Sequence, residues 1–154
     1  MTRVCCEVLR RLKGKTLVTA ESLTGGGIGA ALTAVPGSSA VYKGGIISYT
    51  DWVKENLLDV PGDILLSHGA VSQPVAAAMA CGVRRHLQAD VAVSVTGLAG
   101  PDGDAFGNPV GTVFIGYEDS GRSLVEHHVF TGSREEIRNQ TLEAALKLIL
   151  QNQP

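Results

Sequence analysis

Apolar residues recur along the chain with two different periods, and these predict an alternation of helices and strands. Spacings of three and four predict helices over residues 2–13, 25–35, 51–58, 63–67, 73–87 and 134–151. Period-two alternation or short apolar runs predict strands over residues 16–20, 41–49, 90–96, 110–117 and 123–130. Because helices alternate with strands until a final hairpin, we expect an α/β fold with a mixed, partly parallel sheet and helices packed on it.

Length and composition fit a single domain over residues 1–154. The hydrophobic fraction is 44% and the formal net charge is −2, so charge gives no reason to expect nucleic acid or an anionic membrane as a partner. No apolar run is long enough to span a bilayer, and the N-terminus lacks the apolar core of a signal peptide, so we expect a cytoplasmic protein. The three cysteines and four histidines show no metal-ligand spacing, and we expect no metal.

Glycines mark two places of the chain, one inside a predicted strand and one in a long loop. Gly44 and Gly45 fall inside the second predicted strand and indicate a bulge or a close backbone approach there. Residues 97–109 are rich in glycine and proline and form the longest irregular segment of the chain. Loops of this length in compact domains are often functional, so this segment is a candidate part of a binding site.

The stretch Thr19–Gly27 carries the first candidate for chemistry. It joins a predicted strand to a predicted helix through three glycines, which let the backbone approach a ligand closely. Unpaired N–H groups at a helix N-terminus stabilise an anion or a developing oxyanion, and a hydroxyl there can act as a nucleophile. Ser22 is the candidate nucleophile. The alternative is that Ser22 or Thr24 is an ordinary N-cap of the helix.

Three segments with polar residues begin where predicted strands end: 21–27, 49–54 and 97–111. Ligands of α/β sheets bind beyond the carboxyl ends of the strands, so we expect Ser22, Tyr49 and Lys54 to share one pocket. A serine nucleophile needs a base, and a desolvated lysine with a lowered pKa can supply one. The alternatives are that Lys54 is a solvated helix lysine and that Tyr49 is a packing residue.

No known phosphate-binding fingerprint follows the first strand, because both Gly-Lys-Ser/Thr and GxGxxG are absent there. Backbone N–H groups of residues 97–103 can wrap a polar ligand instead, although such loops also occur for structural reasons. Arg134 and Arg138 are the remaining phosphate candidates, since arginine pairs with phosphate through two hydrogen bonds. Both are equally compatible with surface charges.

Several stretches in the same order resemble one family, the C-terminal domain of the competence/damage-inducible protein CinA, also found alone as nicotinamide-nucleotide amidase. The resemblance covers essentially the whole chain. It is carried by Thr19–Gly26 (TAESLTGG), Pro36–Ser39 (PGSS), Tyr49–Lys54 (YTDWVK), His68–Ser72 (HGAVS), Ser94–Gly103 (SVTGLAGPDG), Pro109–Val113 (PVGTV) and Thr131–Arg134 (TGSR) with Arg138.

The resemblance implies hydrolysis of the carboxamide of nicotinamide mononucleotide to nicotinate mononucleotide and ammonia, in pyridine-nucleotide salvage. It implies Ser22 as the nucleophile and Lys54 as the general base, with Tyr49 nearby in a less defined role. N–H groups around residues 24–26 are then expected to stabilise the oxyanion of an acyl transfer that needs no metal.

The resemblance also leads us to expect no cofactor, a pyridine nucleotide as the small-molecule partner, and a homo-oligomer. The expected substrate-binding residues are Thr24, Gly25, Gly26, Ser38, Ser39, Thr96, Gly97, Gly100, Arg134 and Arg138. Many family members carry a larger N-terminal domain linked to ADP-ribose pyrophosphatase activity, and we expect that second activity to be absent here. The alternative function is a non-catalytic nucleotide-binding or regulatory module linked to competence or DNA damage. Retention of Ser22 and Lys54 favours the enzyme.

Overall fold

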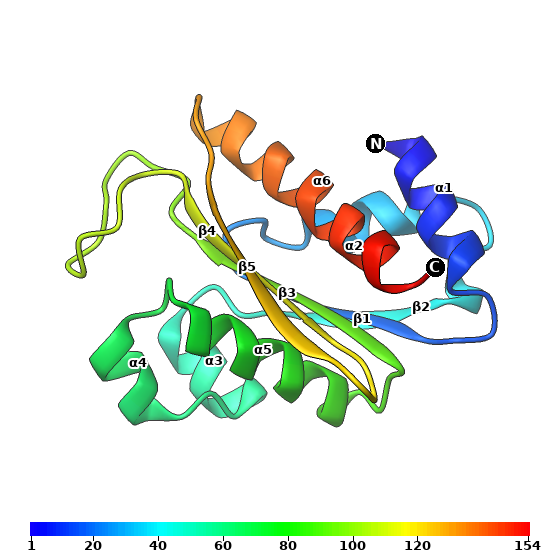
Figure 1. The fold of residues 1–154 in the computed structure, drawn as a ribbon, viewed down its shortest axis with the longest axis horizontal. Coiled ribbons are helices and arrows are strands. Elements are labelled where there is room, and N and C mark those ends of the chain that lie inside the picture. Colours follow the sequence, from blue (N-terminus) through cyan, green and yellow to red (C-terminus); the bar gives the residue numbers. More distant parts are fainter.

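A computed structural model describes residues 1–154 and shows the strand before Ser22 inside a five-stranded sheet (Figure 1). The strands are β1 (Leu17–Glu21), β2 (Tyr42–Ile47), β3 (Val91–Gly97), β4 (Thr112–Glu118) and β5 (Ser123–Val129), in the spatial order β2-β1-β3-β4-β5. β1 pairs in parallel with β2 and β3, whereas β4 and β5 are antiparallel to their neighbours. The predicted mixed, partly parallel sheet is confirmed.

Helices cover both faces of this sheet (Figure 1). One face carries α3 (Asp51–Leu58), α4 (Gly62–His68) and α5 (Gln73–His86), and the other carries α1 (Thr2–Arg11), α2 (Gly27–Thr33) and α6 (Arg134–Asn152). Side chains of β1 alternate between the two apolar cores, with Leu17 in one and Val18 and Ala20 in the other. Both faces of the central strands β1 and β3 are buried, as expected for strands that helices cover on both sides.

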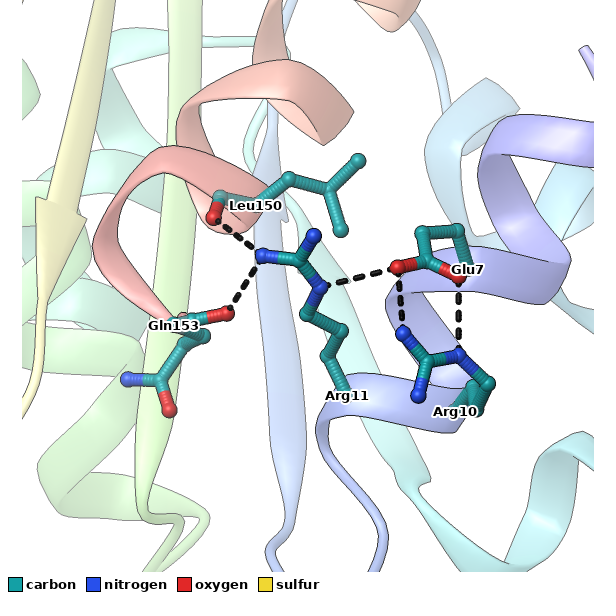
Figure 2. Close-up of polar contacts among 5 residues, drawn as sticks. All are labelled: Glu7, Arg10, Arg11, Leu150 and Gln153. Carbon is teal, nitrogen blue, oxygen red and sulfur yellow. Dashed lines mark hydrogen bonds and ion pairs between the residues drawn. The ribbon is translucent and has the colours of Figure 1, made fainter.

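A polar clasp joins α1 to the end of α6, two elements far apart in the sequence (Figure 2). Arg11 donates from Nη1 to the carbonyl oxygens of Leu150 and Gln153, at 3.3 and 3.2 Å, and so satisfies carbonyls that α6 leaves without a helical partner. Glu7 accepts hydrogen bonds from Arg10 and Arg11, and these lower the pKa of its carboxyl group to about 2. The clasp holds both helices on one face of the sheet.

Two local features differ from or refine the sequence-based expectations. The pairing register of β1 and β2 shifts between Leu17, which faces Tyr42, and Val18, which faces Gly44, so the predicted bulge is confirmed. Helix α2 begins two residues later than predicted, and its N-cap is Gly26 with φ of 99°. The capping alternative for Ser22 and Thr24 is therefore wrong, because the chain needs a left-handed residue to enter α2, which glycine adopts without strain.

Residues 38–40 form a short 3-10 helix, η1 (Ser38–Ala40), where a loop was expected. Thr50 caps α3 and Ser133 caps α6, each accepting a hydrogen bond from a backbone N–H three residues later. None of the helices combines the length and the apolar composition that crossing a membrane requires.

Candidate active site

Ser22 directly follows β1 in a turn fixed by its own backbone and by its neighbour Glu21. The Ser22 N–H donates to the Val95 carbonyl at 3.1 Å, which extends the pairing of β1 with β3 by one residue. The Glu21 carboxylate, only 2% exposed, accepts hydrogen bonds from the Ile28 and Gly29 N–H groups at 2.8 and 3.0 Å. This buried carboxylate ties the end of β1 to the start of α2, so the turn that carries Ser22 is held at both ends.

Lys54 reaches the same point from α3. Its Nζ lies 3.0 Å from the Ser22 Oγ and 2.7 Å from the Ser48 carbonyl oxygen, and it donates a hydrogen bond to each. The side chain is 1% exposed, and burial lowers the pKa of the Lys54 amine, while the negative charge of Asp51 acts in the opposite direction. The alternative of a solvated helix lysine is therefore wrong, because the amine is buried and lies within hydrogen-bonding distance of the Ser22 hydroxyl.

A cavity of about 310 Å³ opens above this pair. Of the residues expected at the site, it is lined by Ser22, Tyr49, Lys54, Thr96, Gly97, Gly100 and Arg134. They come from the carboxyl ends of β1, β2 and β3, the start of α3 and the start of α6, as the parallel order of the first three strands predicts. The sequence-based expectation that Ser22, Tyr49 and Lys54 share one pocket is confirmed.

Tyr49 and Arg134 lie at the mouth of the cavity. Tyr49 is 60% exposed, and its hydroxyl oxygen accepts a hydrogen bond from Arg134 Nη2 at 3.4 Å. Arg134 Nη1 donates to the Gly100 carbonyl, so this guanidinium joins α6 to the loop after β3. Thr96 is buried, and its hydroxyl donates to the Ala70 carbonyl at 2.8 Å.

Other expected binding residues lie elsewhere or serve the turn itself. Ser38 and Ser39 belong to η1, which precedes β2, and since β1 and β2 are parallel they lie at the opposite end of the sheet from Ser22. The Thr24 hydroxyl donates to the Glu21 carboxylate at 2.7 Å. Arg138 donates to the Leu23 and Thr24 carbonyls at 3.0 and 3.2 Å. None of these side chains lines the cavity.

The glycines of the turn also lie outside the cavity. Gly25 sits against Arg138, because a Cβ added there would lie 3.8 Å from its Nη2 atom. Gly26 lines a separate cavity of about 200 Å³ beside Thr19 and Tyr42. The two glycines therefore shape the backbone of the turn and its entry into α2.

Backbone N–H groups without a protein acceptor lie in the turn after Ser22. Glu21 already occupies the Ile28 and Gly29 N–H groups at the start of α2. The N–H groups of Leu23, Thr24 and Gly26 donate to no protein acceptor. Leu23 is the residue after Ser22, and in α/β-hydrolases the residue after the nucleophile supplies an oxyanion donor.

Sequence reasoning missed three acidic residues at this site. Glu21 carried a signal, because a charged residue closes an otherwise apolar strand just before the glycine-rich turn. Asp51 and Asp102 line the cavity, and their carboxylates take part in no hydrogen bond or ion pair within the protein. The structure contains no group of three or more His, Cys, Asp or Glu side chains arranged to hold a metal ion.

Comparison with known proteins identifies the family of this chain. The family model described as the CinA C-terminal domain matches residues 2–153. The chain belongs to the CinA C-terminal domain family. Among curated relatives, a CinA-like protein of Synechococcus sp. (strain CC9311) is 60% identical over 110 residues, covering 70% of this chain and 26% of that protein. A CinA-like protein of Citrifermentans bemidjiense is 47% identical over 139 residues, covering 90% and 34%. The chain thus spans about a quarter to a third of the length of these relatives.

Solved structures of the CinA superfamily share the whole fold. The competence damage-inducible protein A from Klebsiella pneumoniae is 35% identical with a TM-score of 0.94, covering 96% of this chain and 93% of that chain. A CinA superfamily protein from Escherichia coli is 34% identical with a TM-score of 0.95, covering 97% and 88%. The sheet and its six helices are therefore the CinA C-terminal architecture.

Proposed function

We propose that this chain is a nicotinamide-nucleotide amidohydrolase that converts nicotinamide mononucleotide to nicotinate mononucleotide and ammonia. One observation carries the proposal: a buried lysine amine lies 3.0 Å from a serine hydroxyl at the base of a cavity. Burial makes the charged form of this lysine costly and so favours the neutral amine, which is the form that can act as a base. The resemblance of the ordered motifs to the amidase branch of the family supplies the substrate.

In the first step Lys54, neutral, accepts the Ser22 hydroxyl proton while Oγ attacks the carboxamide carbon. A C–O bond forms and the carbonyl oxygen becomes an oxyanion. The unpaired N–H group of Leu23, which lines the cavity, is the donor that we assign to that oxyanion. One such donor contributes about 3 kcal/mol in acyl transfer enzymes.

In the second step the proton on Lys54 passes to the amide nitrogen, the C–N bond breaks and ammonia leaves. Water then attacks the Ser22 ester with Lys54 again as the base, which releases the carboxylic acid product and restores the hydroxyl. Lys54 takes up and returns the proton in each step. The Ser48 carbonyl, which accepts a hydrogen bond from Lys54 at 2.7 Å, keeps the amine in place through both steps.

The nucleotide part of the substrate is assigned to the mouth of the cavity. Arg134 is the phosphate candidate, since its guanidinium lines the mouth at the N-terminal end of α6. Gly97 and Gly100 line the same cavity and present backbone to the ligand. Arg138 is no longer a phosphate candidate, because it holds the turn after Ser22 through two carbonyls.

Ammonia release tests the proposal, with nicotinamide mononucleotide as substrate and free nicotinamide as the control compound. Ser22→Ala and Lys54→Ala are each expected to lower kcat by at least about a thousandfold. Ser120→Ala and Lys13→Ala are the matched controls, since both side chains are exposed and form no side-chain hydrogen bond. Both are expected to keep wild-type activity.

A folded wild-type protein that releases no ammonia from the nucleotide contradicts the proposal. The alternative, a non-catalytic nucleotide-binding module, then predicts heat of binding for the same nucleotide in calorimetry without turnover. Activity that survives in Lys54→Ala but not in Ser22→Ala contradicts only the assignment of the base.

A further inference from the structure

Two carboxylates line the catalytic cavity without a partner in the protein. Asp51 begins α3, and Asp102 lies in the loop after β3, so they come from separate segments of the chain. Neither forms a hydrogen bond or belongs to any of the ion pairs of the structure. The one guanidinium of the cavity, Arg134, donates instead to the Gly100 carbonyl and the Tyr49 hydroxyl.

The charge balance of the cavity is therefore negative when Lys54 is neutral. Two carboxylates stand against one guanidinium, which leaves one uncompensated negative charge around a ligand. Tyr49 adds an aromatic ring that is 60% exposed at the same mouth. Carboxylates and an aromatic ring together are the groups that proteins use to attract an organic cation.

The part of the ligand that meets this charge follows from the position of Ser22. A carboxamide carbon within bonding reach of the Ser22 Oγ carries its ring one bond away, so the ring must lie inside the same cavity. The cavity holds about 310 Å³, which accommodates an aromatic ring beside its lining. The ring, and not only a phosphate further out, is then exposed to the field of the two carboxylates.

We propose that the cavity selects a carboxamide carried on a positively charged, N-substituted aromatic ring, and that Asp51 and Asp102 recognise the ring charge. This inference rests on the proposed amidase function and names the feature of the substrate that the site recognises. It also gives the two carboxylates a role after the reaction. Hydrolysis turns the neutral carboxamide into a carboxylate, which Asp51 and Asp102 repel, so the same residues favour departure of the product.

The matched ligands are nicotinamide mononucleotide and its reduced form. Both contain the same carboxamide, ribose and phosphate, but the reduced dihydropyridine ring has no positive charge. Ring charge also makes the carboxamide carbon more electrophilic, so a wild-type preference for the oxidised nucleotide does not by itself show that the carboxylates recognise the ring. The decisive quantity is how the ratio of kcat/KM for the oxidised and reduced nucleotides changes when a carboxylate is neutralised.

The experiment measures kcat/KM for ammonia release from the two nucleotides with the wild type, Asp102→Asn and Asp51→Asn. Both aspartates are exposed and unbonded, so the variants are expected to fold. Asp102→Asn is expected to lower the preference for the oxidised nucleotide about three- to tenfold, through KM, with little change for the reduced one. Asp51→Asn also alters Lys54, but the ratio of the two substrates cancels an effect on the base.

Asp63→Asn is the control, because Asp63 is exposed on α4 and lies outside the cavity. It is expected to leave the preference unchanged. A preference that stays the same in both Asp51→Asn and Asp102→Asn, while turnover persists, overturns the charge inference and leaves the amidase proposal standing.

Calorimetry with Ser22→Ala separates the two proposals, since it needs no turnover. About tenfold tighter binding of the oxidised nucleotide, lost when Asp102→Asn is added, supports the charge inference even if the wild type releases no ammonia. Equal binding of the two nucleotides overturns it.

Discussion

At the scale of single residues, Lys54 sets the balance between stability and chemistry. Its amine is 1% exposed and is held by one serine hydroxyl and one carbonyl, with no carboxylate in an ion pair. Burial lowers the pKa of this amine below its ordinary value, so protonating it costs the folded state more than the unfolded chain. A lowered lysine pKa means that the unfolded chain binds the extra proton, and stability therefore rises with pH between the folded pKa and about 10.4.

Lys54→Met tests this linkage without any assay of activity. The free energy of unfolding of the wild type is expected to rise relative to the variant as pH increases from 7 towards 10, by at most about 1.4 kcal/mol per pH unit. Urea unfolding over that pH range measures the difference, in which tyrosine and cysteine contributions cancel. Lys13→Met, at an exposed lysine, is expected to follow the wild type. Parallel curves for the wild type and Lys54→Met would show that the buried amine is not the titrating group.

At the scale of elements, the contact between α3 and α5 fixes where Lys54 lies. Gly82 of α5 is buried against the Leu58 carbonyl, with which α3 ends, and a Cβ at Gly82 would lie 1.9 Å from that oxygen. The obstacle is backbone, which cannot rotate away as a flexible side chain does. The close approach of the two helices therefore depends on the missing side chain at this position.

Gly82→Ala separates two opposing effects. Helix propensity alone favours alanine by about 1 kcal/mol, whereas forcing α3 away from α5 costs about 1 to 3 kcal/mol or more. We expect the clash to dominate, so that the variant is less stable in urea and loses ammonia release because Lys54 moves with α3. Cys81→Ala, at the exposed neighbouring position, is the control and is expected to keep both properties. A more stable, fully active Gly82→Ala protein would contradict this account of the helix contact.

At the scale of the whole molecule, the sequence predicted the sheet and the meeting of Ser22 with Lys54 well. It predicted the substrate-binding residues around them less well. Ser22 and Lys54 follow or flank parallel strands, and parallel strands end at one edge, so topology alone brings them together. The same argument places Ser38 and Ser39 at the opposite edge of the sheet, because they precede β2 and do not follow it. The partners of Arg138 depend on how α6 crosses the turn after Ser22, and spacing along the chain carries no information about that distance.

The helix N-terminus gives the second instance of this limit. Pattern and glycine content indicated an anion site at the start of α2, and an anion is indeed bound there, but it is the chain's own Glu21. Whether a helix end meets a ligand or an internal carboxylate depends on the path of the turn between them. That path is set by tertiary contacts, including the hydrogen bond from Ser22 to Val95.

The carboxylates of the molecule also predict how the whole fold responds to acid. The pKa values of several carboxyl groups are lowered in the folded state; they belong to Glu7, Asp59, Asp90, Asp104, Asp119 and Glu143. A lowered folded pKa contributes stability above the ordinary value near 4, and that stability is lost as pH falls through the folded value. All of these groups are exposed or half-exposed, so each contributes little and salt weakens the ion pairs that some of them form.

We therefore expect the contribution of these carboxyl groups to Tm to stay level from about pH 7 to 5 and to be lost between about pH 4.5 and 2, less steeply in high salt. Asp90 is the sharpest single test, because hydrogen bonds from the Thr16 N–H and hydroxyl lower the pKa of its carboxyl group and join the starts of β1 and β3. Asp90→Asn should have a lower Tm than the wild type at pH 7, and this difference in Tm should become smaller at pH 2. Asp63→Asn, whose carboxylate accepts no hydrogen bond, should have the Tm of the wild type at both pH values. Thermal melts by circular dichroism measure both. A gap between Asp90→Asn and the wild type that stays constant with pH would mean that Asp90 contributes through shape and not through its charge.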